Sequence, residues 1–139
     1  MPALDRVAGR ATWRLSRANA RAQSLLAAAF ASEGVRGYHF RVLAALEQYG
    51  PSSQADLGRY TGIDRSDIVA TLNDLLARHL VERRPDAVDR RRNIVMITKQ
   101  GARALRRLDD HVDDVQEQFL APLNPRERSA LVRLLAKLA

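Results

Sequence analysis

Five arginine side chains lie within ten residues of one another, at Arg83, Arg84, Arg90, Arg91 and Arg92. Guanidinium groups bind phosphates and guanine edges, and arginines inserted into a narrow minor groove read the shape of DNA. A run of arginines is more often a solvated surface. This run, however, lies at the predicted tip of a β-hairpin that follows a predicted recognition helix, and that position favours binding to nucleic acid.

A second group of polar residues opens the helix that precedes this hairpin. Asp64 is a good N-cap, and the expected non-core side of the helix carries Arg65, Ser66, Asp67, Ala70, Thr71 and Asp74. In a helix-turn-helix, the second helix enters the major groove and its first turns contact base edges. Arg65 would bind guanine or a phosphate. Asp67 would accept a hydrogen bond from cytosine, orient Arg65, or only stabilise the helix dipole.

The predicted DNA contacts combine the two groups with the start of the preceding short helix. They are Ser53, Gln54, Arg65, Ser66, Asp67, Ala70, Thr71, Arg90, Arg91 and Arg92.

The helices that position these residues follow from apolar spacing. Apolar residues recur at three- and four-residue steps from Leu4 to about Ser32, which predicts one long amphipathic helix that ends before Gly34. A second helix covers about residues 40–49 and stops at Gly50. A short helix then begins at a serine cap, with Leu57 and Tyr60 expected to face inward.

After the recognition helix, the spacing of apolar residues changes from a helical to a strand pattern. After the helix from Asp64 to about His79, residues 81–84 and 93–98 have the composition of two short strands. Two helices follow, with Thr98 and Asn124 as their predicted N-caps. The predicted fold is therefore mainly α with a small β-hairpin wing, in the order α-α-α-α-β-β-α-α.

Composition agrees with this fold and limits the classes of function. The 139 residues suit one domain, and 46% hydrophobic against 5% aromatic residues is typical of packed helices. The formal net charge is +7 and the pI is about 10.9, as expected of a nucleic acid binder. There is no cysteine, which excludes disulfides, thiolate zinc sites and thiol redox sensing.

Neither a membrane span nor a signal peptide is expected. No apolar run is long enough to cross a bilayer, and Asp5, Arg6 and Arg10 interrupt any apolar segment near the N-terminus. We therefore expect a cytoplasmic protein that does not bind membranes.

An enzyme is the first alternative, and the sequence disfavours it. The three histidines, His39, His79 and His111, accompany no glycine-rich phosphate loop or nucleophile motif. His111 and Asp114 could hold a metal, but an acidic solvated helix face is the better explanation. We expect neither a cofactor nor a metal. A sequence-tolerant architectural DNA-binding protein without an effector stays open, and a basic membrane-surface protein would need a continuous basic amphipathic helix.

The residues of the helix and wing resemble one known family. Asp64-Arg65-Ser66-Asp67-Ile68-Val69, Leu80-Val81-Glu82-Arg83, Asp89-Arg90-Arg91 and Ile97-Thr98-x-x-Gly101 are similar to the MarR (multiple antibiotic resistance regulator) family. The resemblance is densest over residues 53–101. It implies a winged helix-turn-helix transcriptional regulator, usually a repressor of a pseudo-palindromic operator. It further implies a single domain over 1–139, with its DNA-binding core at about 36–100 and dimerisation helices at about 4–33 and 99–139.

The resemblance also assigns roles to residues. Asp89 would brace Arg91, which would enter the minor groove while Arg90 and Arg92 hold phosphates. A homodimer interface would use the apolar residues of the terminal helices: Leu4, Val7, Leu15, Phe119, Leu123, Leu131, Leu135 and Leu138. Members of the family often release DNA when a small aromatic or anionic effector binds. The candidate effector residues here are Trp13, Arg17, Tyr38, His39 and Arg41, although Trp13 as an interface residue and His39 as a hydrogen-bonded residue are the simpler interpretations.

Two positions depart from the family pattern. His79 replaces the usual glycine at the end of the recognition helix, where a left-handed residue is needed and histidine is tolerated better than most. Asp67 replaces a more usual threonine or serine, which leaves its base contact open.

Overall fold

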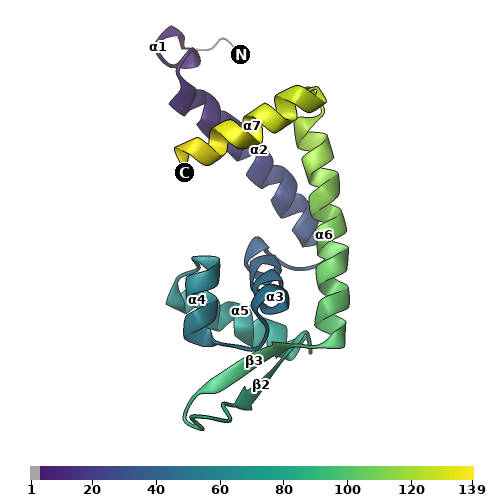
Figure 1. Ribbon diagram of the computed structural model, residues 1–139. Helices are drawn as coiled ribbons and strands as arrows, with labels where there is room; N and C mark the ends of the chain where they lie inside the picture. The colour runs from purple at the N-terminus through teal and green to yellow at the C-terminus, as the bar shows by residue number, and fades with distance from the viewer. Residues whose placement is uncertain (1–3) are drawn as a thin grey trace. The chain divides into compact units, whose positions relative to one another are not determined.

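The computed structural model describes residues 4–139, which divide into two compact units. One unit contains the chain up to Ala29 together with His111–Ala139, and the other contains Phe30–Asp110. The elements run α1 (Asp5–Ala8), α2 (Ala11–Ser32), α3 (Gly37–Tyr49), β1 (Ser52–Ser53), α4 (Gln54–Thr61), α5 (Arg65–Ala77), β2 (Val81–Pro85), β3 (Asn93–Ile97), α6 (Lys99–Leu120) and α7 (Pro125–Leu138) (Figure 1). The predicted mainly helical fold with a β-hairpin wing is confirmed.

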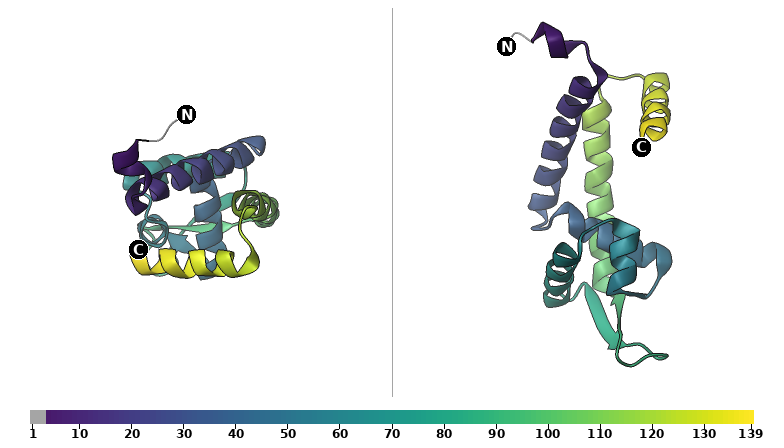
Figure 2. Two further views of the ribbon diagram at one scale, coloured as in Figure 1. Left: turned by 90° about the horizontal axis from the view of Figure 1, so that it is seen from above. Right: turned by 90° about the vertical axis from the view of Figure 1, so that its left-hand side faces the viewer.

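The core of the Phe30–Asp110 unit is aliphatic and is formed by α3, α4, α5 and the sheet. Its fully buried side chains include Leu43, Leu57, Leu72 and Val95. The hairpin of β2 and β3 extends from the helices of this unit, and its tip is the part farthest from them (Figure 2). Burial of these side chains fixes α5 and the hairpin to one another.

The sheet has one strand more than the sequence predicted. The strand order is β1-β3-β2, all antiparallel, with Ser52 opposite Val95 and Arg83 opposite the same valine on the other side. The two-residue β1 carries no alternating pattern, and its partner lies more than 40 residues away in the chain. The predicted element order was wrong at this point.

The predicted helix from Leu4 to Ser32 was also wrong, because it is interrupted. Helix α1 starts after Leu4 and ends at Ala8 with Gly9 as its C-cap, and α2 begins at Ala11. Glycine is a poor helix former because it loses the most backbone freedom on ordering. The apolar spacing continued across this break and hid it.

Most of the predicted helix ends are confirmed by cap geometry. The side chains of Ser53, Asp64 and Asn124 each accept a hydrogen bond from the backbone N–H three residues later. Thr98 does the same for Gly101 at 3.0 Å. Tyr60, in contrast, was predicted to face inward but is 45% exposed, and it stacks on exposed Tyr49 with ring centroids 4.0 Å apart.

The unit of the terminal segments has a sparse core of its own. Neither α1 nor α7 buries a side chain, and Leu4 and Leu138 are about three-quarters exposed. Arg21 donates hydrogen bonds to the carbonyls of Gln118 and Phe119 at 3.2 and 2.9 Å, and its guanidinium lies over the Phe119 ring. Within residues 4–139, no helix is long and apolar enough to cross a membrane.

Candidate nucleic-acid interface

A cap of three residues starts the helix predicted to read DNA. The Asp64 carboxylate accepts hydrogen bonds from the Asp67 backbone N–H at 3.0 Å and from the Ser66 hydroxyl at 2.8 Å. The bond from the Asp67 backbone, and to a smaller extent the bond from Ser66, hold the pKa of the Asp64 carboxyl below its ordinary value. The helix therefore begins with an ionised cap that accepts two hydrogen bonds, and Arg65 directly follows it.

A groove of about 800 Å³ lies between this helix start and the wing. Its lining residues come from the end of β1, from α4, from the turn before α5, from α5 and from the hairpin: Ser53, Gln54, Ala55, Gly58, Arg59, Ile63, Arg65, Ile68, Arg83, Arg91, Arg92, Asn93 and Val95. Five of them are arginines and none is acidic. The groove brings together Ser53, Gln54, Arg65, Arg91 and Arg92 from the predicted contact set.

Three of these arginines have no partner among residues 4–139. In the part of the chain that the structure describes, Arg65, Arg83 and Arg92 make no hydrogen bond, ion pair or ring contact through their side chains. Arg59 differs, because it is paired with Asp56. Unpaired guanidinium groups that face one groove provide a strong attraction for a polyanion.

The wing tip has an internal scaffold. The Asp86 backbone N–H donates to the Arg92 carbonyl at 2.8 Å, and the Arg92 N–H donates to the Asp89 carbonyl at 3.0 Å. The Asp89 carboxylate accepts from the backbone N–H and the Nε of Arg91 at 3.1 and 3.3 Å. Arg91 is nonetheless 93% exposed, so the structure places Asp89 beside Arg91 as expected and leaves most of the guanidinium free for another molecule.

Adjacent arginines of β2 face opposite sides of the sheet. Arg83 lines the groove, whereas Arg84 lies on the other face, in a hollow with Glu82, Met96 and Lys99. Arg84 also forms an ion pair with Glu82 at 3.1 Å. Both arginines were predicted to belong to one basic cluster, and neither Arg83 nor Arg59 was among the predicted DNA contacts. Strand alternation from the buried Val81 would have identified Arg83 as the groove-facing member.

One predicted contact was assigned to the wrong side of its helix. Thr71 is only 5% exposed, although it was expected on the non-core side. With Ile68, Leu72 and Leu75 it forms an i, i+3, i+4, i+7 stripe, so spacing puts it in the core despite its hydroxyl. Val69 and Ala70 are exposed instead. The exposed Val69 offers an apolar surface of the kind that packs against thymine methyl groups, which polarity alone does not indicate.

The remaining predicted DNA contacts lie at the surface or in the cap. Ser66 and Arg90 are exposed, and Asp67 is half-buried in the first turn of α5. Asp67 and Arg65, both among the described residues, form no ion pair with each other. An acid in the first turn of a helix stabilises the helix dipole, and this role fits Asp67. Ser53 is 5% exposed and serves as the cap of α4 while it lines the groove.

The end of the recognition helix is joined to the start of α6. His79 has φ of +60°, so the left-handed conformation expected from a glycine position is present. Its carbonyl accepts a hydrogen bond from the Thr98 hydroxyl at 2.8 Å, and the Leu80 carbonyl accepts from the Thr98 N–H at 3.1 Å. A Cβ on Gly101 would lie 2.0 Å from the Leu80 oxygen. The glycine of the Thr-x-x-Gly pattern is therefore required by close backbone contact.

The candidate effector residues belong to different units. Trp13 and Arg17 lie in the terminal unit, where the Arg17 guanidinium is 5.8 Å from the Trp13 ring centroid. Tyr38, His39 and Arg41 lie in the other unit, where the Arg41 guanidinium is 5.0 Å from the Tyr38 ring. His39 is buried and uses both ring nitrogens in hydrogen bonds within the protein, as its simpler interpretation required.

Comparisons with known proteins find relatives among transcriptional regulators. A family model described as the MarR family matches residues 33–92. The chain is 39% identical over 99 residues to the HTH-type transcriptional repressor NicR of Pseudomonas putida, a match that covers 71% of this chain and 63% of NicR. It is 33% identical over 107 residues to a putative transcriptional regulatory protein for the hcr operon of Thauera aromatica, of which it covers 64%. In both cases the match spans slightly under two thirds of the relative.

Solved structures cover almost the whole chain. A probable transcriptional regulator from Pseudomonas aeruginosa superimposes with a TM-score of 0.84 and 31% identity, over 94% of this chain and 98% of that one. Bordetella bronchiseptica BpsR, whose DNA binding is regulated by 6-hydroxynicotinic acid, gives a TM-score of 0.83 and 27% identity, over 99% and 97% of the two chains.

Proposed function

Because this chain belongs to the MarR family of transcriptional regulators, we propose that it binds a specific pseudo-palindromic DNA operator as a homodimer and represses transcription. The groove between the start of α5 and the wing carries this proposal. Its Arg65, Arg83 and Arg92, which have no side-chain partner among the described residues, line a space bounded by a helix start and a hairpin. In this arrangement the first turns of α5 would contact bases in the major groove, and Arg91 would reach the minor groove.

The proposed homodimer would form through the terminal helices. Leu15, Leu135 and Leu138 are between 38% and 75% exposed, and no residue of α7 is fully buried within the protomer. Burial of each such side chain stabilises an interface by about 1.5–3 kcal/mol. Replacement of Leu131 and Leu135 by glutamate should therefore give a monomer in sedimentation experiments, and a variant that stays dimeric would disprove this interface.

Selection of bound duplexes from a random pool tests the proposed function most broadly. A specific dimeric repressor should enrich a site with dyad symmetry and half-sites about one helical turn apart, about 34–36 Å. The selected site should be bound about 10³-fold or more tightly than random duplex at 150 mM salt. If duplexes are retained but no sequence is enriched, the architectural DNA-binding alternative is supported and the operator proposal is wrong.

We further propose that a small aromatic acid releases the operator, with Trp13 and Arg17 in its site. The support is the aromatic plane beside a guanidinium in this chain and the regulation of BpsR by 6-hydroxynicotinic acid. Trp13 is the sole tryptophan, so its fluorescence reports binding directly. Titration with 6-hydroxynicotinic acid should quench this fluorescence and release the operator, and Arg17→Ala should weaken both effects. Quenching without release would show binding that does not regulate.

A further inference from the structure

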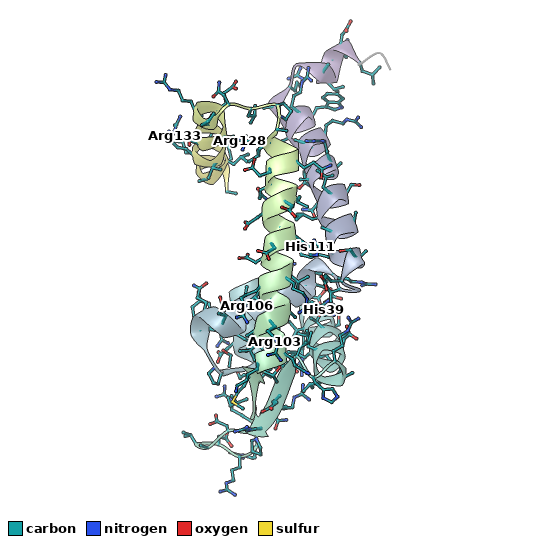
Figure 3. All side chains as sticks on the ribbon, turned by 90° about the vertical axis from the view of Figure 1, so that its right-hand side faces the viewer. His39, Arg103, Arg106, His111, Arg128 and Arg133 are labelled. Carbon is teal, nitrogen blue, oxygen red and sulfur yellow. The ribbon has the colours of Figure 1, made fainter. Side chains whose placement is uncertain are left out.

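A polar network holds the carboxyl-terminal half of the recognition helix. His39 projects from the first turn of α3 and is 7% exposed (Figure 3). Its Nδ1 accepts a hydrogen bond from the Arg36 backbone N–H at 3.0 Å, so the neutral ring carries its proton on Nε2. Nε2 donates to the Asp74 carboxylate of α5 at 2.6 Å. The two helices are thus joined by a directional bond as well as by apolar packing.

The same carboxylate extends the network to a third segment. Asp74 forms an ion pair with Arg78 Nε at 3.1 Å, one turn later on α5. Arg78 then donates a hydrogen bond to the Gly34 carbonyl at 2.7 Å. The turn at residues 34–36, the start of α3 and the last turns of α5 therefore meet at one half-exposed carboxylate.

Asp74 does not lie at the groove. It follows the Asp64 cap by ten residues, about 15 Å along the helix axis, and does not line the arginine groove. A negative charge on a DNA-binding unit opposes the approach of DNA. An acid at this position therefore lowers DNA affinity by its charge, unless it supports binding in another way.

Resting on the proposed function, we propose that Asp74 is a positioning residue for operator recognition. By bonding both His39 and Arg78, it fixes the rotation and axial register of α5 against α3 and the 34–36 turn. Apolar packing alone is not directional and allows small rotations, whereas a shared carboxylate defines one arrangement. A rotation of α5 would move the base-contacting residues of its first turns while leaving phosphate attraction intact.

The test compares affinity for the selected operator with affinity for random duplex at 150 mM salt. Asp74→Asn removes a negative charge, so charge alone predicts tighter binding to both duplexes. Positioning predicts instead that operator affinity falls about tenfold, comparable to one mismatched base pair, while random-duplex affinity is unchanged or slightly higher. Asp109→Asn, on the exposed surface of α6, is the matched control for charge and should keep the wild-type ratio.

Arg78→Gln provides a second test in which the charge effect has the opposite sign. Loss of a cation weakens binding to both duplexes, but positioning predicts a further fall in the ratio of operator to random-duplex affinity. Arg106→Gln, an exposed arginine of α6, controls for that loss of charge (Figure 3). Arg78→Gln also tests the positioning role on its own if Asp74→Asn does not fold.

The outcomes separate the two proposals. If the wild-type protein and both control variants prefer the operator while Asp74→Asn and Arg78→Gln keep the full ratio, the positioning role is wrong and the proposed function stands. If the wild-type protein itself shows no preference, the proposed function fails and the positioning role fails with it. A purely structural role would lower the unfolding temperature without changing the ratio in protein that is still fully folded.

Discussion

The two ends of the recognition helix α5 differ in how their polar groups are satisfied. At the carboxyl end, Asp74 and Arg78 are bonded to α3 and to the Gly34 turn, and the His79 carbonyl is bonded to Thr98. At the amino end the backbone is capped by Asp64, but Arg65 has no partner among the residues described. The protein thus fixes one end of the helix internally and leaves the other with unsatisfied positive charge for a ligand.

Gly101→Ala should have the largest effect, because it disturbs the backbone contact that holds the carboxyl end of α5. The new methyl group would lie 2.0 Å from the Leu80 carbonyl oxygen and 3.0 Å from its carbon, and backbone cannot move aside as a flexible side chain can. We expect a loss of about 3 kcal/mol or more in the free energy of unfolding, measured by urea denaturation.

Gly58→Ala is the matched control for that substitution. Gly58 also lies within a helix, but its nearest contact would be an ordinary 3.8 Å from the Ile63 carbonyl. Alanine should be neutral there or stabilise by up to about 1 kcal/mol, because it is the better helix former. Equal losses in the two variants would show that close contact with Leu80 is not the reason for Gly101.

Arg91→Ala tests the open end at the wing. Loss of a minor-groove arginine should weaken operator binding by about 1–3 kcal/mol and leave the free energy of unfolding unchanged, because Arg91 is 93% exposed. Asp89→Ala should have a smaller effect, since it removes the acceptor that orients Arg91 but also removes a negative charge that opposes DNA. Fluorescence anisotropy with labelled operator measures both, and unaltered affinity in Arg91→Ala would remove this residue from the contacts.

These features were accessible from sequence to different degrees. The caps at Asp64, Thr98 and Asn124 were predictable because capping depends on residues three positions apart. The strand β1 was not, since a two-residue strand has no period and its pairing with β3 is non-local. The break at Gly9 was missed because the apolar spacing runs across it.

The site was predictable in its charge but not in its assembly. The arginine run identified the wing, and the start of α5 identified the second wall of the groove. Thr71 was wrongly predicted to lie on the exposed side because its side chain is polar, whereas its spacing from the apolar residues of α5 places it in the core. The partner of each arginine depends on distant contacts. Arg78 bonds to the Gly34 carbonyl, 44 residues away, while Arg65 has no hydrogen-bond, ion-pair or ring partner among the described residues.

His79→Gly should change the free energy of unfolding by a smaller amount, again at the carboxyl end of α5. The left-handed conformation costs a non-glycine residue about 1–2 kcal/mol, and part of the gain is offset by the greater backbone entropy of glycine in the unfolded chain. We expect a net stabilisation of about 0.5–1 kcal/mol in urea denaturation. His79→Ala keeps the strain and should not stabilise, which distinguishes backbone relief from loss of the imidazole.

The effect of pH on Asp74 should be the smallest. Burial alone would raise the pKa of this carboxyl, but the His39 hydrogen bond and the Arg78 charge outweigh it and leave the pKa below its ordinary value. Its contribution to stability is therefore complete above the unfolded pKa of about 3.9 and is lost as pH falls through the folded pKa. Because the carboxylate is 41% exposed, the stability difference between wild type and Asp74→Asn should be under about 1 kcal/mol at pH 7. Urea denaturation should show that this difference shrinks below about pH 4, and a difference that grew with acid would contradict the depressed pKa.

The salt dependence of DNA binding in Arg83→Ala and Arg84→Ala tests the groove most directly. The two residues are adjacent on β2 and carry equal charge, but only Arg83 lines the groove. If DNA occupies it, Arg83→Ala should reduce the slope of log Kobs against log salt concentration by about one, while Arg84→Ala leaves the slope unchanged. Equal slopes in the two variants, whether lowered or not, would show that DNA does not occupy this groove.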